Sequence, residues 1–189
     1  MNTKFSYYLE LAARWHVFIL LSIYGSGKLL GGQFYRKGKL PEEIAKIPLS
    51  DVGGFDLAWT FMGYSYTYIL VIGISQLVGA FLLLFHKTKL IGVAILMPIL
   101  VNIIVFDAVF FETYGALVSA SIYFLLLFYI LWYNKENVIK SIKALTAELT
   151  RGHKVNNKLS SGLITMGFVI GIMMLIFGVE QLVVNYLGH

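Results

Sequence analysis

Residues 90–111 read LIGVAILMPILVNIIVFDAVFF, an apolar run in which Asp107 is the single charged residue. A helix needs about 20 predominantly apolar residues to cross the hydrocarbon core of a membrane, and this run has that length. Lipid offers no hydrogen-bond partner to an exposed backbone group, so a spanning segment of this kind is predicted to be helical. The stretch therefore indicates an integral membrane protein.

The composition of the whole chain agrees with this class. Hydrophobic residues make up 58% of the 189 residues and charged residues 13%, whereas a soluble domain has about 45–50% and 25%. A disordered chain, a coiled coil and an ordinary soluble domain are therefore excluded. The absence of cysteine excludes disulfides, thiolate nucleophiles and Cys-ligated metals.

Four further apolar runs extend the prediction to five spans. They are Trp15–Gly32, which Lys28 interrupts, then Tyr66–Phe85, Tyr114–Tyr133 and Gly162–Leu187. The expected fold is all-α, a four-helix transmembrane bundle at 1–133 with an outward-facing loop at 33–65. A basic cytoplasmic linker at 134–158 and an appended fifth transmembrane helix at 159–189 follow.

The basic residues predict the orientation. Ten of the fifteen Lys and Arg fall on the side of the N-terminus, four fall on the other side, and Lys28 lies in a span. Basic residues concentrate on the cytoplasmic side, so we expect a cytoplasmic N-terminus and an outside C-terminus. If the first run were not a span, the N-terminus would lie outside. The net charge of +5 is thus explained by topology and does not indicate nucleic acid.

Two segments outside the spans have amphipathic character. The stretch Phe55–Phe61 contains Trp59 and is predicted to lie along the membrane interface, where Trp is favoured. In the linker, Val138, Ile142, Leu145 and Leu149 recur at helical spacing. Its lysines are expected to meet anionic lipid head groups.

Several motifs in the first 133 residues resemble one known family. They are Tyr24-Gly25-Ser26-Gly27-Lys28-Leu29-Leu30, Trp59–Ser65, the span containing Gly73, Gln76 and Gly79, the basic turn His86–Lys89, and Asn102 with Asp107. Over about residues 14–133 the chain resembles the DoxX-like family of small bacterial membrane proteins, most closely the Bacteroidetes type. Gln76 stands where a Glu is more usual in that family.

This resemblance implies a four-helix bundle in the bacterial inner membrane. It also implies an accessory or anchoring subunit of a redox- or quinone-linked membrane complex, with quinone as a possible cofactor. The implied partners are other membrane subunits and lipids. The fifth helix lies outside the resemblance.

Polar residues inside the predicted spans are the candidate site. A charge at the centre of a bilayer costs about 2.5–3.5 kcal/mol on insertion scales, so it needs a partner or a watery cavity. Lys28, Asp107 and Glu180 are expected at similar depth in the outer half, with Gln76 and Asn102 deeper and Tyr24 one turn from Lys28. They would form a structural ion pair, or a polar pocket that binds a ligand or carries protons, unless Lys28 alone reaches the interface.

Three functions follow from these patterns. The first is the accessory subunit with a polar pocket; the second is a binder or carrier of a lipid-soluble small molecule such as quinone or lipid. A proton-coupled transporter is less favoured, because neither inverted repeats nor broken helix pairs are evident. No catalytic signature is visible, so enzymatic activity is left open. His16 and His86 lie at the ends of spans, which does not favour a haem, and no metal site is predicted.

Overall fold

The computed structural model describes residues 3–111, 114–151, 166–167 and 169–179. All regular secondary structure in these ranges is helical. The chain divides into two compact units, residues 1–141 and 142–189, and each is described by itself.

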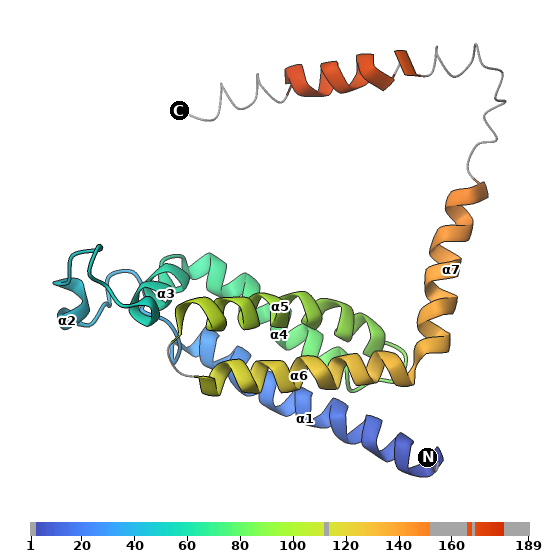
Figure 1. The fold of residues 1–189 in the computed structure, drawn as a ribbon, viewed down its shortest axis with the longest axis horizontal. Helices are drawn as coiled ribbons and strands as arrows, with labels where there is room; N and C mark the ends of the chain where they lie inside the picture. The colour runs from blue at the N-terminus through green and yellow to red at the C-terminus, as the bar shows by residue number, and fades with distance from the viewer. Residues whose placement is uncertain (1–2, 112–113, 152–165, 168, 180–189) are drawn as a thin grey trace. The chain divides into compact units, whose positions relative to one another are not determined.

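Four long helices build the first unit, namely α1 (Thr3–Leu30), α4 (Tyr66–Leu82), α5 (Lys89–Phe110) and α6 (Tyr114–Tyr133). α1 packs against α4 and α6, and α5 packs against the same two helices, so the four form a closed ring (Figure 1). Apolar side chains from all four fill its centre: Val17, Leu21, Ala80, Leu83, Val93, Leu96, Leu100, Ala120, Leu127 and Ile130.

Glycines set how closely the helices approach. A Cβ placed on Gly92 of α5 would lie 2.6 Å from the carbonyl oxygen of Gly79 in α4. A Cβ on Gly73 of α4 would lie 2.7 Å from a side-chain carbon of Leu29 in α1. Only hydrogen fits at Gly92, where the close atom is backbone, whereas at Gly73 the Leu29 side chain would have to shift. Small residues permit this close approach between apolar helices.

Helix α3 (Gly54–Gly63) runs at 91° to α4, which follows it after a break at 64–65. Ser65 caps the start of α4, and its hydroxyl accepts a hydrogen bond from the backbone N–H of Tyr68 at 3.3 Å. Figure 1 shows α3 beside the end of α5 and the short helix α2 (Glu42–Ala45) beyond it. The predicted stretch with Trp59 is therefore a helix, and its place at a membrane interface stays a prediction.

Helix α1 begins at Thr3, so it extends beyond the N-terminal end of the predicted first span at Trp15. The sequence pattern placed the charged residues Glu10 and Arg14 before the span, but both are buried and paired inside α1. The other boundaries are closer: α4 ends at Leu82 rather than Phe85, and α5 ends one residue before the predicted Phe111.

By length and composition, two described helices can cross a membrane, α5 and α6. A third is added if α3 and α4 count as one bent span. α4 alone has only 17 residues. Apolar helices of membrane-spanning length are thus present, while the number five stays a prediction.

The linker and the last predicted span are described in part. Helix α7 (Lys135–Arg151) occupies most of the predicted amphipathic linker, so its helical character is confirmed. An apolar helix at Val169–Val179 lies inside the predicted fifth span. Residues 166–167 of that span are helical too, while 162–165, 168 and 180–187, Glu180 included, lie outside the described residues.

Candidate ligand cavity

A cavity of about 240 Å³ lies in the first unit, at the end where α1 and α5 finish and α4 and α6 begin. Its wall is mostly apolar and rich in aromatic rings: Phe34, Phe55, Trp59, Phe106 and Phe111. Its polar lining residues are Tyr24, Lys28, Gln33, Gln76, Asn102, Asp107, Ser119 and Tyr123. An apolar cavity with a few convergent polar groups is the usual form of a small-molecule site.

Lys28 and Gln76 form a fixed pair on the wall. The Lys28 Nζ donates to Gln76 Oε1 at 2.9 Å, and Gln76 Nε2 donates to the carbonyl oxygen of Leu21 at 2.9 Å. Both side chains are buried. A carboxylate at position 76 has no proton for the Leu21 carbonyl, whereas the amide accepts from the ammonium and donates to α1 at once. This gives a structural reason for Gln at a position where the resemblance suggested Glu.

Asp107 is the unpaired charge of the cavity. It is 6% exposed and lies three residues before the end of α5. In the part of the chain that the structure describes, no cation lies within 4.0 Å of its carboxylate, and its side chain has no hydrogen-bond partner. Lys28 and Asp107 line the same cavity without a contact within 4.0 Å. The ion-pair interpretation named Asp107 or Glu180 as the partner of Lys28, and its Glu180 alternative lies outside the described residues.

A further acceptor and two phenols complete the polar lining. Gln33 Oε1 is buried and has no hydrogen-bond donor among the described residues. The rings of Tyr24 and Tyr123 lie 6.4 Å apart, centroid to centroid. A ligand would meet a donor at Lys28 and acceptors at Asp107 and Gln33.

The chain after α1 and helix α3 form one layer at the mouth of the cavity. The Tyr35 backbone N–H donates to the carbonyl oxygen of Trp59 at 3.2 Å, and its hydroxyl donates to Asp56 Oδ1 at 3.0 Å. Burial and the hydrogen-bonded carboxylate of Asp56 raise the pKa of Tyr35 above its ordinary value. The neighbouring Phe34 has φ 71°, a conformation that costs free energy in a bulky residue and is kept only where packing fixes it. The Phe34 ring packs edge-on against the Trp59 ring, with 5.9 Å between the two ring centroids.

A second polar cluster lies at the opposite end of the four-helix ring. Glu10 is its centre: Lys89 Nζ lies 2.8 Å from Glu10 Oε1, Arg14 Nε 3.2 Å from Oε2, and Asn134 Nδ2 donates to Oε1 at 3.3 Å. Arg14 Nη1 also donates to the carbonyl oxygen of Leu83, near the end of α4, at 3.3 Å. All four side chains are buried. We call this group the Glu10 cluster.

Sequence reasoning missed the Glu10 cluster. It counted Arg14 and Lys89 as topological charges outside the spans. The available signal was the spacing of Glu10 and Arg14, which places them on one helical face. Their partner Lys89 comes from another helix and could not be found from spacing.

The structure brings five of the six predicted site residues to one cavity. Lys28, Gln76, Asp107, Asn102 and Tyr24 line it, although Asn102 and Tyr24 are largely exposed. Glu180 lies outside the described residues. Among the described residues, no group of three or more His, Asp or Glu side chains could hold a metal ion.

Fold and cavity together define a helical protein with apolar helices of membrane-spanning length around a mostly apolar cavity that has a few polar groups on its wall. No family model matches the chain, and no solved structure matches it. It is similar to the uncharacterized protein YwoB of Bacillus subtilis (strain 168), with 41% identity over 88 residues. That match covers 47% of this chain and 53% of the relative, so the chain spans about half the length of the curated relative it matches.

Proposed function

We propose that the chain is a DoxX-like four-helix bundle of the bacterial inner membrane, with an appended fifth helix, that binds a lipid-soluble small molecule. The observation that carries the proposal is the unpaired carboxylate of Asp107 in an aromatic cavity, opposite the ammonium of Lys28. The binding site would lie in the outer half of the bundle.

The exposed faces of the long helices support the membrane placement. Outward-facing residues of the ring are apolar, for example Val71, Ile74 and Val78 on α4, Val101, Val105 and Val109 on α5, and Val118, Ile122 and Leu125 on α6. An apolar surface of this extent marks a membrane or protein contact. Lipid matches it without requiring a partner for each face.

Helix α1 fits the same placement although it carries more charged residues than α5 or α6. Three of its four charged residues, Glu10, Arg14 and Lys28, are buried, and Lys4 near its first turn is exposed. Ile19 and Ile23 are exposed as well. Ionisable residues within spanning helices characteristically face the bundle interior. The 28 residues of α1 are more than a span requires.

The chemistry of the lining suggests the class of ligand. Flat rings pack favourably against aromatic side chains, and Phe55, Trp59 and Phe106 supply these. A carbonyl oxygen can accept from Lys28, while a hydroxyl can donate to Asp107. A quinone or quinol head group carries such oxygens on a flat ring, so this is the class we propose.

Quenching of Trp59 fluorescence by added menadione tests the proposal on the full chain in mild detergent, with Trp15→Phe and Trp132→Phe present in every sample so that Trp59 is the one tryptophan that emits. Asp107→Asn is expected to weaken binding about ten- to a hundredfold, because a hydrogen bond to a charged group contributes about 1.5–3 kcal/mol. Asp51→Asn is the matched control, since it removes an exposed carboxylate outside the cavity. Equal affinities of Asp107→Asn and the unmodified protein would contradict the proposed site.

The anchoring of a partner complex, expected from the resemblance, stays a prediction of its own. It is compatible with ligand binding, because a subunit can hold a quinone for its complex. Stoichiometric co-purification of a second chain from native membranes would support it. A partner-free chain with retained small molecule would leave ligand binding as the whole function.

A further inference from the structure

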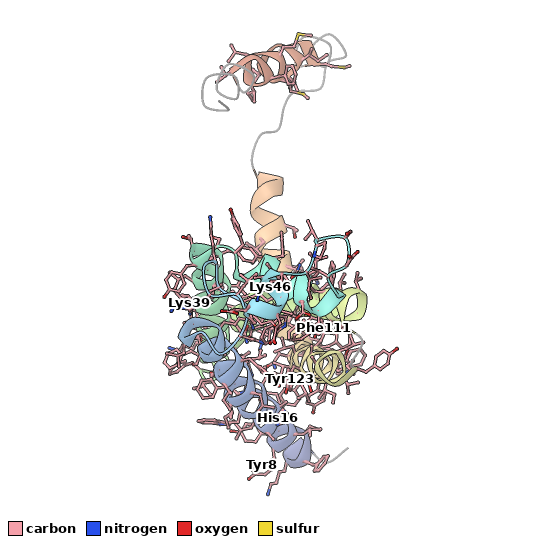
Figure 2. All side chains as sticks on the ribbon, turned by 90° about the vertical axis from the view of Figure 1, so that its left-hand side faces the viewer. Tyr8, His16, Lys39, Lys46, Phe111 and Tyr123 are labelled. Atoms are coloured by element: carbon pink, nitrogen blue, oxygen red, sulfur yellow. The ribbon has the colours of Figure 1, made fainter. Side chains whose placement is uncertain are left out.

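A second cavity, of about 410 Å³, opens on the surface of the first unit near the α3 end. It is lined by Arg36, Lys37, Lys39, Gly63, Tyr64 and Tyr66. Figure 2 looks onto this end of the unit and labels Lys39 there. We call it the basic cavity.

The basic cavity gathers three cations without an anion. No carboxylate of the described residues lies within 4.0 Å of Arg36, Lys37 or Lys39. Lys46, on the same loop, shows the contrast, because it pairs with Glu42 at 3.6 Å. Like charges held close together repel, and a bound anion relieves that repulsion.

Contacts with aromatic rings and backbone hold two of the cations in place. The Arg36 guanidinium lies 5.0 Å from the centre of the Tyr66 ring, and its Nη2 donates to the carbonyl oxygen of Leu29 at 2.8 Å. Lys37 Nζ lies 4.6 Å from the centre of the Tyr64 ring and donates to its hydroxyl at 3.2 Å. These cation–π contacts leave N–H donors free for an anion.

The backbone of the segment turns the third cation toward the others. The Lys39 N–H donates to the carbonyl oxygen of Arg36 at 2.8 Å, which closes a turn through Gly38. Gly38 has φ 79°, a conformation that glycine adopts without steric cost. The cavity is therefore built by a defined turn packed on the start of α4.

The position of the cavity points to the source of the anion. Tyr66 is the first residue of α4, and Leu29 lies in the last turn of α1. In the membrane placement proposed above, on which this step rests, both residues lie where the helices leave the hydrocarbon. Tyr64 and Tyr66 are typical of that depth.

We propose that the basic cavity binds the phosphate group of an anionic glycerophospholipid. An arginine fork recognises phosphate oxygens in pairs, and lysine adds point charges beside it. A free phosphate ester offers the same chemistry, so the test has one arm for each source.

The first arm measures how much phosphatidylglycerol stays bound to the full chain in nanodiscs of mixed phosphatidylcholine and phosphatidylglycerol. The double variant Lys37→Gln/Lys39→Gln keeps the bond from Arg36 to Leu29 and hence the end of α1. Each removed cation is expected to lower phosphatidylglycerol enrichment about fivefold. Lys46→Gln is the matched control and should leave the enrichment unchanged.

The second arm titrates the detergent-solubilised protein with glycerol phosphate by calorimetry. Binding that the double variant loses, without lipid enrichment, would assign the cavity to a soluble phosphate ester. If the double variant equals the unmodified protein in both arms, the proposal is overturned.

Menadione quenching in the same preparations separates this proposal from the proposed function. The double variant should keep menadione binding, and Asp107→Asn should keep phosphatidylglycerol enrichment. Asp107→Asn could lose menadione binding while the double variant changes neither lipid enrichment nor phosphate-ester binding. That result would support the quinone site and overturn the phosphate site.

Discussion

The two ends of the four-helix ring differ in whether their buried carboxylate is paired. In the Glu10 cluster, the carboxylate contacts Arg14, Lys89 and Asn134. At the other end, Asp107 has no hydrogen bond and no ion pair within 4.0 Å among the described residues, and it lines a cavity of about 240 Å³. Both carboxylates are nearly inaccessible to solvent. The difference between them is therefore pairing rather than depth.

This difference separates a structural role from a binding role. Removing one partner of a buried, hydrogen-bonded ion pair leaves an uncompensated charge and destabilises the fold. Replacing an unpaired carboxylate beside a cavity breaks no ion pair or hydrogen bond of the fold. Its oxygens are free to accept hydrogen bonds from a ligand. The Glu10 cluster has two cations, Arg14 and Lys89, and one anion. The C-terminal end of α4 has partial negative charge that favours the extra cation, and there the carbonyl oxygen of Leu83 accepts a hydrogen bond from Arg14.

The largest expected effect is that of Glu10→Gln. It removes the carboxylate charge that Arg14 and Lys89 share, so we expect a loss of about 3–5 kcal/mol of unfolding free energy. Chemical denaturation in detergent measures it. Glu42→Gln, which breaks the exposed pair with Lys46, should change stability by less than about 1 kcal/mol. Similar changes in unfolding free energy for both variants would show that the Glu10 cluster does not stabilise the fold.

Close packing at the Glu10 end gives the next effect. A Cβ at Gly92 would lie 2.6 Å from the carbonyl oxygen of Gly79 and 3.0 Å from the backbone nitrogen of Leu83. Gly92→Ala is therefore expected to cost about 1–3 kcal/mol. Gly27→Ala in α1 has nothing within 4 Å of its new Cβ and should be neutral or stabilising, by up to about 1 kcal/mol. A neutral Gly92→Ala would indicate that α4 and α5 can separate there.

Asp107→Asn should have a small effect on stability although it abolishes a buried charge. We expect a change within about 1 kcal/mol, because no ion pair or hydrogen bond of the carboxylate is lost. Thermal unfolding of Asp107→Asn and Glu10→Gln side by side gives the direct comparison. A loss as large as that of Glu10→Gln would make Asp107 a structural residue too.

The smallest effect concerns the layer at the mouth of the cavity. The raised pKa of Tyr35 means that its contribution to stability is present below the unfolded-state pKa of about 10 and is lost as pH rises through the folded-state pKa. Asp56→Asn removes the neighbouring charge and should lower the pKa of Tyr35 toward its ordinary value. A difference titration of tyrosinate absorbance against Asp51→Asn detects this shift, and identical curves would contradict the contact.

The sequence predicted the neighbourhood of Lys28 and Asp107 from depth alone. Helices rise about 1.5 Å per residue, so the distance of each residue from the end of its run gives its level. The same reasoning placed Gln76 and Asn102, and the structure finds all four on one cavity. It could not predict that Lys28 binds Gln76 rather than Asp107, because depth carries no information about which faces meet.

The Glu10 cluster and α3 show the opposite case. Glu10 lies before the apolar run, where a carboxylate is expected in water, and only the packing of α1 against its neighbours places Lys89 and Asn134 beside it. The turn of 91° between α3 and α4 likewise has no signature in the composition of Trp59–Ser65. Both features depend on contacts between segments that are distant in the sequence or on local backbone direction.

By itself, the sequence determined the helical class, the apolar runs long enough for a membrane, and the levels at which polar residues occur. Hydropathy fixes these because the free energy of transfer into an apolar phase depends on each residue and its position along the run. The tertiary structure alone decided which charges are paired, which line the cavity, and which face the basic cavity. Those outcomes depend on how each helix is rotated and how closely the helices approach. Glycines allow the close approach because they have no side chain, as at the contact between Gly79 and Gly92.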